Sequence, residues 1–269
     1  MSQFLPIEEL KQWLRETVVH RLVAIMFFLF LLQMLLEAFG WYTGMTLEGF
    51  ILTFFALQPI ALWSAGQIWS VLSYGFLHYG FMHVLFNALM LYFSGHMLKT
   101  FWTDRQVVRL FLLGIVSGGI VFLGASTFGA DWKPLVGASG GVLALIVAAA
   151  RNSPQMPVYL FGFLRVPLWG VAGLLVMLSL SGLQGENAGG NLAHLGGAAI
   201  GFLLAKSPHL LSSAWIGRRP NDKGKTHLRI VKKEAHEFLL DDLLDKIAKV
   251  GYSQLSRREK EFLEGYGKK

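Results

Sequence analysis

Six apolar stretches, most of them nearly as long as a membrane is thick, dominate this 269-residue chain. They lie at 22–39, 74–98, 107–123, 135–150, 166–183 and 188–205. A helix of about 20 apolar residues spans the hydrocarbon core of a bilayer, where backbone polar groups must be paired within the protein. The stretches therefore predict an all-α fold, a polytopic membrane bundle of six transmembrane helices embedded in the lipid bilayer.

Composition supports a membrane protein and excludes several classes of function. Hydrophobic residues make up 54% of the chain and charged residues 15%, against roughly 25% charged residues in a typical soluble domain. The chain has no cysteine, which excludes disulfides and thiolate chemistry. Fifteen of the 24 Lys and Arg residues lie at 206–269. Because no basic patch is interleaved with aromatic residues, we expect no nucleic-acid partner.

The placement of the cations predicts an orientation in the membrane. The connections on one side carry nearly all cations that precede the tail, and those on the other side carry only Lys133. The cations of the first side are Lys11, Arg15, Arg21, Lys99, Arg105, Arg109, Arg151, Arg165 and Lys206. Since cytoplasmic connections are enriched in Lys and Arg, both termini are predicted to be cytoplasmic. The compact plan, without a transit peptide, favours a bacterial inner membrane.

Three segments follow from this organisation: a cytoplasmic N-terminal segment at 1–21, the membrane domain at 22–206, and a basic cytoplasmic linker and helical tail at 207–269. Residues 40–67 are apolar and rich in aromatic residues and glycine, and we expect a loop that dips into the outer interface. In the tail, an apolar stripe at 238–247 and the capping-box spacing of Ser256 and Glu259 predict a small helical pair. The alternative is a tail that orders only against a partner or the membrane.

Four polar residues of the apolar stretches are predicted to lie at similar depth. His83 and Asn87 are four residues apart and share one face of the second span. Ser139 lies near the start of the fourth span and His194 near the start of the sixth. All three spans begin on the outer side in the predicted orientation. Because ionisable groups inside a membrane are costly and usually functional, these residues are candidates for a site.

Small residues indicate that the fourth and sixth spans pack closely. The small residues concerned are Gly137 and Gly141 in the fourth span, and Ala193, Gly197, Gly201 and Ala205 in the sixth. Small residues at four-residue spacing let helix backbones approach in lipid. Close packing of these two spans would bring Ser139 and His194 within hydrogen-bond reach.

A serine and a histidine at that distance can act as a nucleophile and its general base. An oxyanion would need donors, and the candidates are the backbone N–H of Ser139, the amide of Asn87 and the ring of His83. Because the second, fourth and sixth spans hold no carboxylate, we expect a Ser–His dyad rather than a triad. The alternatives are a packing role for Ser139, an interhelical role for Asn87, and a metal site of His78, His83 and His194, which would lack an acidic ligand.

Three separated motifs resemble those of the rhomboid family of intramembrane serine proteases. They are His78-x4-His83-x3-Asn87, Gly137-Ala138-Ser139-Gly140 and Ala193-His194-x2-Gly197-x3-Gly201. Their order and the six spans agree with the family, and the resemblance covers about residues 19–206. It implies that Ser139 is the nucleophile, that His194 is the general base and that His83 and Asn87 form part of the oxyanion hole. We expect no cofactor and no metal. The implied substrates are single-span or other membrane proteins, and the sequence carries no signal of an oligomeric state.

The chain departs from the family pattern at three positions. Ser70 follows Trp69 where members have arginine, and Lys99 stands where many have glutamate. Leu143 replaces a tyrosine that stacks on the catalytic histidine in some members. We therefore expect His194 to be less firmly oriented than in those members, which would slow turnover.

Two other classes of function are alternatives to a protease. An inactive rhomboid-like protein that binds client proteins would usually lack the serine or the histidine, and this chain retains both. A transporter or channel would show inverted repeats or charged residues within the spans, and the sequence has no convincing repeat. The retained residues favour the protease.

Overall fold

The computed structural model describes residues 7–43, 47–63, 65–128, 132–160, 162–212, 243, 246–249, 251–256 and 260. Contacts between Cα atoms divide the chain into two units, Met1–Ser213 and Ala214–Lys269. Most of the helical pair predicted for the tail lies outside the described residues, and in that unit the structure describes the 3-10 turn η6 (Tyr252–Gln254). The site is built entirely within the first unit.

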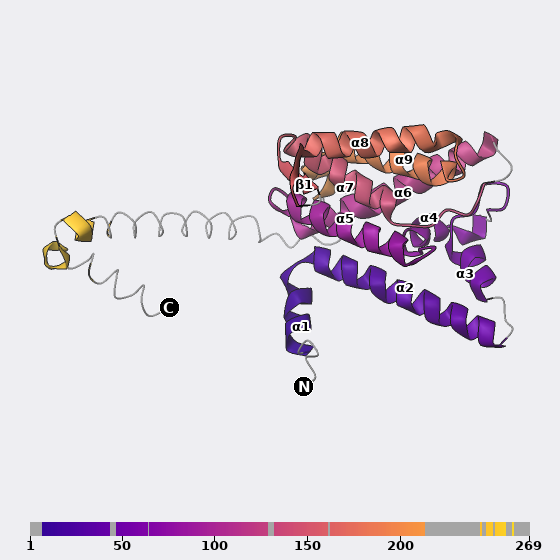
Figure 1. Ribbon diagram of the computed structural model, residues 1–269, viewed down its shortest axis with the longest axis horizontal. Coiled ribbons are helices and arrows are strands. Elements are labelled where there is room, and N and C mark those ends of the chain that lie inside the picture. Colours follow the sequence, from indigo (N-terminus) through magenta and orange to yellow (C-terminus); the bar gives the residue numbers. More distant parts are fainter. Residues whose placement is uncertain are drawn as a thin grey trace. The chain divides into compact units, whose positions relative to one another are not determined.

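The first unit is helical apart from one hairpin (Figure 1). Its long helices are α2 (Val18–Thr43), α5 (Phe81–Lys99), α6 (Asp104–Ala125), α7 (Ser139–Asn152), α8 (Leu168–Ser181) and α9 (Ala188–Leu204). Its shorter helices are α1 (Ile7–Glu16), α3 (Leu47–Phe55) and α4 (Ser70–Ser73). Its 3-10 turns are η1 (Ala65–Gln67), η2 (Tyr74–Phe76), η3 (Ser126–Phe128), η4 (Gly182–Gln184) and η5 (Pro208–Leu211). Strands β1 (Pro157–Leu160) and β2 (Leu164–Pro167) pair antiparallel, with Pro157 opposite Pro167.

The six long helices correspond to the six predicted spans, and the predicted helical membrane bundle is confirmed. By length and composition, α2, α5 and the continuous segment Asp104–Phe128 are each able to cross a membrane. The helices α7, α8 and α9 are apolar but shorter. The 14 residues of α7 extend about 21 Å at ~1.5 Å per residue, which is less than the ~30 Å hydrocarbon core.

Two predicted helix starts and one predicted loop differ from the structure. The second span was expected from residue 74, but α5 begins at Phe81 because the preceding residues form the turn η2 and an extended connection. The fourth was expected from residue 135, but Leu135 pairs with Leu57 in a β-bridge, so α7 begins at Ser139. The loop expected at 40–67 contains the helix α3, whose nine residues are too few to span a membrane.

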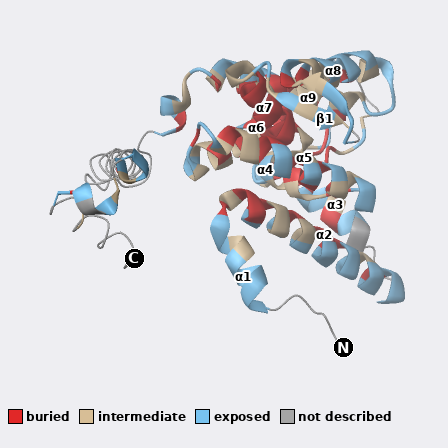
Figure 2. Ribbon diagram, turned by 60° about the vertical axis from the view of Figure 1, so that its left-hand side comes forward, coloured by how far each residue is buried: buried red, intermediate tan, exposed pale blue. Residues whose placement is uncertain are grey.

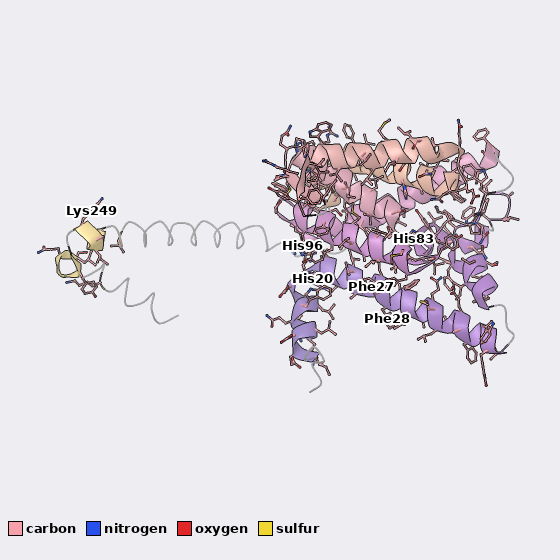
Figure 3. All side chains as sticks on the ribbon, in the orientation of Figure 1. His20, Phe27, Phe28, His83, His96 and Lys249 are labelled. Atoms are coloured by element: carbon pink, nitrogen blue, oxygen red, sulfur yellow. The ribbon has the colours of Figure 1, made fainter. Side chains whose placement is uncertain are left out.

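Helix α7 forms the centre of the bundle. Ten of its 14 residues are buried, and it contacts α5, α6, α8 and α9. Figure 2 shows the buried residues concentrated on α6 and α7, whereas α2 is largely exposed. Exposed apolar side chains on α2, such as Phe28 (Figure 3), are those expected of a lipid-facing surface. Because α7 packs against four other helices, the position of Ser139 at its start is fixed.

Glycines bring three of these helices into backbone contact. A Cβ placed on Gly197 of α9 would overlap the carbonyl of Gly140 on α7, and one on Gly201 would overlap Ala144. A Cβ on Gly196 would lie 2.9 Å from the carbonyl oxygen of Ser117 on α6. Contacts of this kind hold helices together in lipid, where hydrophobic burial between helices contributes little.

We expect Gly201→Val to lower the thermal unfolding temperature of the protein in detergent micelles. The added side chain would overlap the backbone of Ala144 and force α7 and α9 apart, and overpacking of this kind costs about 1–3 kcal/mol. The matched control is Gly173→Val on α8, because a Cβ at Gly173 meets no atom within 4 Å. Equal unfolding temperatures for the two variants would contradict the backbone contact.

Candidate active site

Ser139 and His194 lie side by side at the beginning of α7 and α9. The Nε2 atom of His194 lies 2.7 Å from Oγ of Ser139, which is hydrogen-bond distance. Ser139 is the first residue of its helix and His194 lies in the second turn of its own. The arrangement places a hydroxyl against a ring nitrogen that can accept its proton.

The segment before Ser139 is held by backbone hydrogen bonds to distant residues. Leu57 and Leu135 exchange N–H···O bonds of 3.1 and 2.8 Å, and the N–H of Gly137 donates to the carbonyl of Tyr74 at 2.9 Å. The hydroxyl of Tyr79 donates to the carbonyl of Pro134 at 2.7 Å. These contacts fix where α7 starts and therefore where the hydroxyl of Ser139 lies.

Gly137 is required for two reasons. Its φ of +114° lies in a region that glycine adopts readily and other residues rarely do. A Cβ at this position would also lie 2.7 Å from Nε2 of His83. The glycine two residues before Ser139 therefore lets the ring of His83 on α5 (Figure 3) approach the serine loop.

His83 and Asn87 line the same cavity as Ser139 and His194. Asn87 is buried, and its Nδ2 donates one hydrogen to the carbonyl of His83 at 2.9 Å. An amide nitrogen carries two hydrogens, so one remains for another acceptor. Because α7 begins at Ser139, the N–H groups of its first turn have no acceptor within the helix. The ring of His83, the amide of Asn87 and the first turn of α7 are thus three candidate sources of hydrogen-bond donors at the cavity that Ser139 lines.

The cavity has a volume of about 840 Å³. An exposed ion pair lies among its lining residues, with Nζ of Lys133 3.7 Å from the carboxylate of Glu186. Apolar side chains from α5, α7 and α8, including Met90, Ile146 and Leu175, line another part of it. The cavity is therefore both large enough to hold water and partly apolar.

Ser179 on α8 is a site residue that sequence reasoning missed. Its Oγ lies 3.1 Å from Nδ1 of His194 and 2.9 Å from the carbonyl oxygen of Leu175. In the sequence it is one serine among apolar residues, fifteen positions before His194. Only the packing of α8 on α9 reveals the contact.

His78 lies behind His83 and does not reach the serine. Its ring is buried and meets the ring of His83 edge to face, with centroids 5.0 Å apart. The side chain of Gln33 on α2 makes two hydrogen bonds to the backbone of His78. It donates to the carbonyl at 3.0 Å and accepts from the N–H at 3.2 Å. Within the ranges that the structure describes, no group of three His, Asp or Glu residues is arranged to hold a metal ion.

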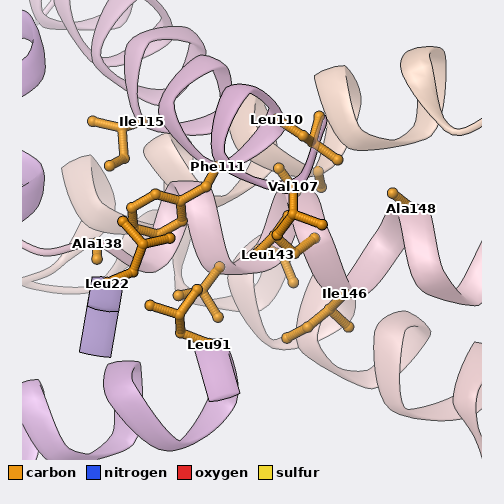
Figure 4. Packing of buried hydrophobic residues seen from close by; sticks show 14 of the residues in the cluster. Leu22, Leu91, Val107, Leu110, Phe111, Ile115, Ala138, Leu143, Ile146 and Ala148 are labelled. Atoms are coloured by element: carbon orange, nitrogen blue, oxygen red, sulfur yellow. The ribbon is translucent and has the colours of Figure 1, made fainter. Parts of the chain in front are cut away.

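The three departures from the family pattern each take a defined place. Ser70 is buried and its Oγ accepts a 3.0 Å hydrogen bond from the indole of Trp63. Lys99 forms a 2.8 Å ion pair with Asp104. Leu143 belongs to the buried cluster that includes Leu91 and Phe111 (Figure 4) and lines the cavity.

Comparison with known proteins assigns the membrane unit to a family. Residues 65–207, more than half of the chain, match the family described as the rhomboid domain. The chain belongs to the rhomboid family. Residues 231–269 match a family of unknown function, DUF6576.

Two relatives set the extent of the similarity. A rhomboid protease GlpG of Yersinia pestis (strain Pestoides F) is 31% identical over 143 residues, which cover 52% of this chain and 48% of that protein. RHOMBOID-like protein 12, mitochondrial, of Arabidopsis thaliana is 25% identical over 151 residues, or 51% of this chain and 45% of that protein. The chain thus spans about half the length of the curated relatives that it matches. The rhomboid family includes serine proteases, and this chain is an integral membrane protein.

We expect Gly137→Ala to reduce the reaction of Ser139 with a serine-directed fluorophosphonate probe about tenfold or more. The new methyl group would meet the ring of His83 and impose an unfavourable φ. The control is Gly162→Ala, because Gly162 also has a positive φ, of +81°, but open space around it. Wild-type labelling of Gly137→Ala would show that His83 need not approach the serine loop.

Proposed function

We propose that this protein is an intramembrane serine endopeptidase that cleaves membrane-spanning proteins through a dyad of Ser139 and His194. The observation that carries the proposal is the 2.7 Å contact between His194 Nε2 and Ser139 Oγ, at a cavity inside a membrane bundle of the rhomboid family. Sequence similarity to a protein named rhomboid protease GlpG supports it. Its substrates would be single-span or other membrane proteins.

Acylation begins when Oγ of Ser139 attacks the carbonyl carbon of the scissile peptide bond. The hydroxyl proton passes to Nε2 of His194 as the bond between Oγ and the carbon forms. When the tetrahedral intermediate collapses, the bond between carbon and nitrogen breaks, and His194 gives the proton to the leaving amine. The product is an ester of Ser139 and a free amino terminus.

Deacylation needs water at the ester. Water in the cavity would lose a proton to Nε2 of His194 and attack the ester carbon. Collapse returns the proton to Oγ of Ser139 and releases a carboxyl terminus. The polar part of the cavity, which includes Lys133 and Glu186, offers a route for this water.

The oxyanion of both intermediates would be stabilised by the donors beside Ser139. These are its own backbone N–H at the start of α7, the second hydrogen of the Asn87 amide, and the ring of His83. The positive end of the dipole of α7 also favours negative charge there. Donors that are already in place stabilise the transition state without reorganisation.

The protein would act with both termini in the cytoplasm of a bacterium, in the inner membrane. The distribution of Lys and Arg along the chain supports this orientation. Ser139 and His194 would then lie in the outer half of the membrane, and the apolar lining of the cavity suits a substrate segment that enters from lipid.

Ser139→Ala and His194→Ala should each abolish both labelling by a fluorophosphonate and cleavage of a single-span reporter in reconstituted vesicles. Removal of either member of a nucleophile–base pair leaves only residual catalysis. The control is Ser181→Ala, because Ser181 is exposed and its hydroxyl donates to the carbonyl of Leu178 in its own helix. Wild-type cleavage by either active-site variant would refute its assigned role. A folded wild type that neither labels nor cleaves would favour the inactive, client-binding alternative.

Asn87→Ala should lower kcat for the reporter by about 10²-fold, since that is the scale on which loss of one oxyanion donor acts. The reaction with the fluorophosphonate should fall as well, because its phosphorus adduct carries a similar oxygen. Ser94→Ala serves as a control on the same helix, since Ser94 is buried and its hydroxyl donates to the carbonyl of Met90. An unchanged kcat would remove Asn87 from the oxyanion site.

A further inference from the structure

We propose that Ser179 is a positioning residue that fixes the proton of His194 on Nδ1 and so keeps Nε2 free to act as the base. The inference rests on the proposed function, since it concerns the orientation of that same histidine. It adds a third side chain, from a third helix, to the pair that the sequence predicted.

The hydroxyl of Ser179 has one hydrogen and two neighbouring polar atoms. A serine hydroxyl has one hydrogen to donate and two lone pairs that accept. Among the described residues, its Oγ lies 2.9 Å from the carbonyl oxygen of Leu175 and 3.1 Å from Nδ1 of His194. A carbonyl oxygen only accepts, so the contact with Leu175 is a hydrogen bond only if the serine hydrogen points to it. Both contacts are then hydrogen bonds at once only if Nδ1 of His194 carries a hydrogen.

If Nδ1 carries the hydrogen, Nε2 of His194 is the nitrogen that accepts. In a neutral imidazole one nitrogen carries hydrogen and the other accepts. With hydrogen on Nδ1, the lone pair of Nε2 faces Oγ of Ser139 at 2.7 Å. The opposite tautomer would place an N–H against the nucleophile, and the hydrogen of Ser179 would have to leave the carbonyl of Leu175 to reach Nδ1. Ser179 therefore favours the one tautomer that can remove the proton of Ser139.

The hydroxyl of Ser179 is itself held in place. Its side chain is 3% exposed, and the bond to Leu175 is the backward bond that serines in helices make to the carbonyl four residues earlier. A second contact holds the end of α8 to α9, because Nδ2 of Asn191 on α9 donates to the carbonyl of Gly182, the residue that follows α8, at 2.9 Å. The acceptor for Nδ1 is thus fixed before any substrate binds.

Leu143 explains why this chain needs such a residue. An aliphatic side chain in the cluster around α7 offers neither a ring to stack on His194 nor a polar atom to bond it. In the described part of the chain, the ring of His194 makes side-chain hydrogen bonds to Ser139 and Ser179 alone. The expectation that His194 is less firmly oriented than in members with the tyrosine stays a prediction, and Ser179 on α8 would supply a restraint of another kind.

The size of the effect should be moderate. Serine is neutral, so it cannot stabilise the charged imidazolium as a carboxylate does in a serine protease triad, where its loss costs about 10⁴ in kcat. A neutral hydrogen bond contributes modestly, so its loss is expected to lower the rate by about tenfold, or ~1.4 kcal/mol. We expect kcat to fall by about that factor, with KM unchanged.

The decisive comparison is Ser179→Thr against Ser179→Val in the full chain, with cleavage of a single-span reporter measured in vesicles. Threonine keeps the hydroxyl and valine has the same shape without it, so packing is matched. Ser179→Thr should retain kcat, and both Ser179→Val and Ser179→Ala should lose about tenfold. Ser181→Ala, which alters a serine of the same helix that does not touch His194, should match the wild type.

A second measurement reports on the tautomer directly. Protein labelled with ¹⁵N and ¹³C in histidine gives ring shifts that distinguish hydrogen on Nδ1 from hydrogen on Nε2, and His194→Gln identifies the signal. We expect the Nδ1–H form in the wild type and in Ser179→Thr, and a mixture in Ser179→Val. A merely structural role of Ser179 would not change this ratio.

Equal kcat and an unchanged tautomer in Ser179→Val would overturn the inference. Parallel losses in the threonine and valine variants would also overturn it, because the effect would then follow shape rather than the hydroxyl. Ser139→Ala is measured beside them. Should Ser139→Ala cleave like the wild type, the proposed function itself fails, whereas an inactive Ser139→Ala with a fully active Ser179→Val defeats only the role of Ser179.

Discussion

The backbone contact between α7 and α9 is the constraint on which the rest of this site depends. Gly140 and Gly197 bring the two helices together where neither has a side chain to separate them. Ser139 is the residue before one of these glycines, and His194 lies three residues before the other. The distance between hydroxyl and imidazole is thus set by a packing contact one turn away, and larger residues at either glycine would move the pair apart.

Polar groups inside the helical bundle need hydrogen-bond partners, and other residues of the bundle supply most of these partners. His194 lies between two serines, and Asn87 bonds the backbone of His83. The backbone of His78 is held by Gln33, although both nitrogens of its ring are buried without a partner among the described residues. Unpaired polar groups are costly in such surroundings. The hydroxyl of Ser139 and the donors around it stay accessible because they face a cavity.

Sequence patterns predicted the helices well and their beginnings poorly. Hydropathy reports which segments avoid water, so six apolar stretches became six helices. The start of α7 depends on Leu57, which pairs with Leu135 although the two are far apart in the sequence. Hydropathy does not reveal which distant residues pair. The positions of Ser139 and His194 were predictable since small residues at fixed spacing mark close helices. The position of Ser179 was not predictable, because it is one of two serines in an apolar helix and no spacing distinguishes it from Ser181.

The proposed restraint on the ring of His194 comes from Ser179 on α8 and not from an aromatic ring on α7. Leu143 lies on the central helix, whereas Ser179 lies on a helix whose outer face exposes Trp169, Leu174 and Met177. Leu175 and Ser179 also line the cavity, so the helix that bounds the cavity also carries the hydroxyl that contacts Nδ1. A shift of α8 away from α9 would lengthen this contact, whereas the glycine contact joins α7 to α9. In the proposed mechanism, the orientation of His194 and the width of the cavity would therefore be coupled through one helix.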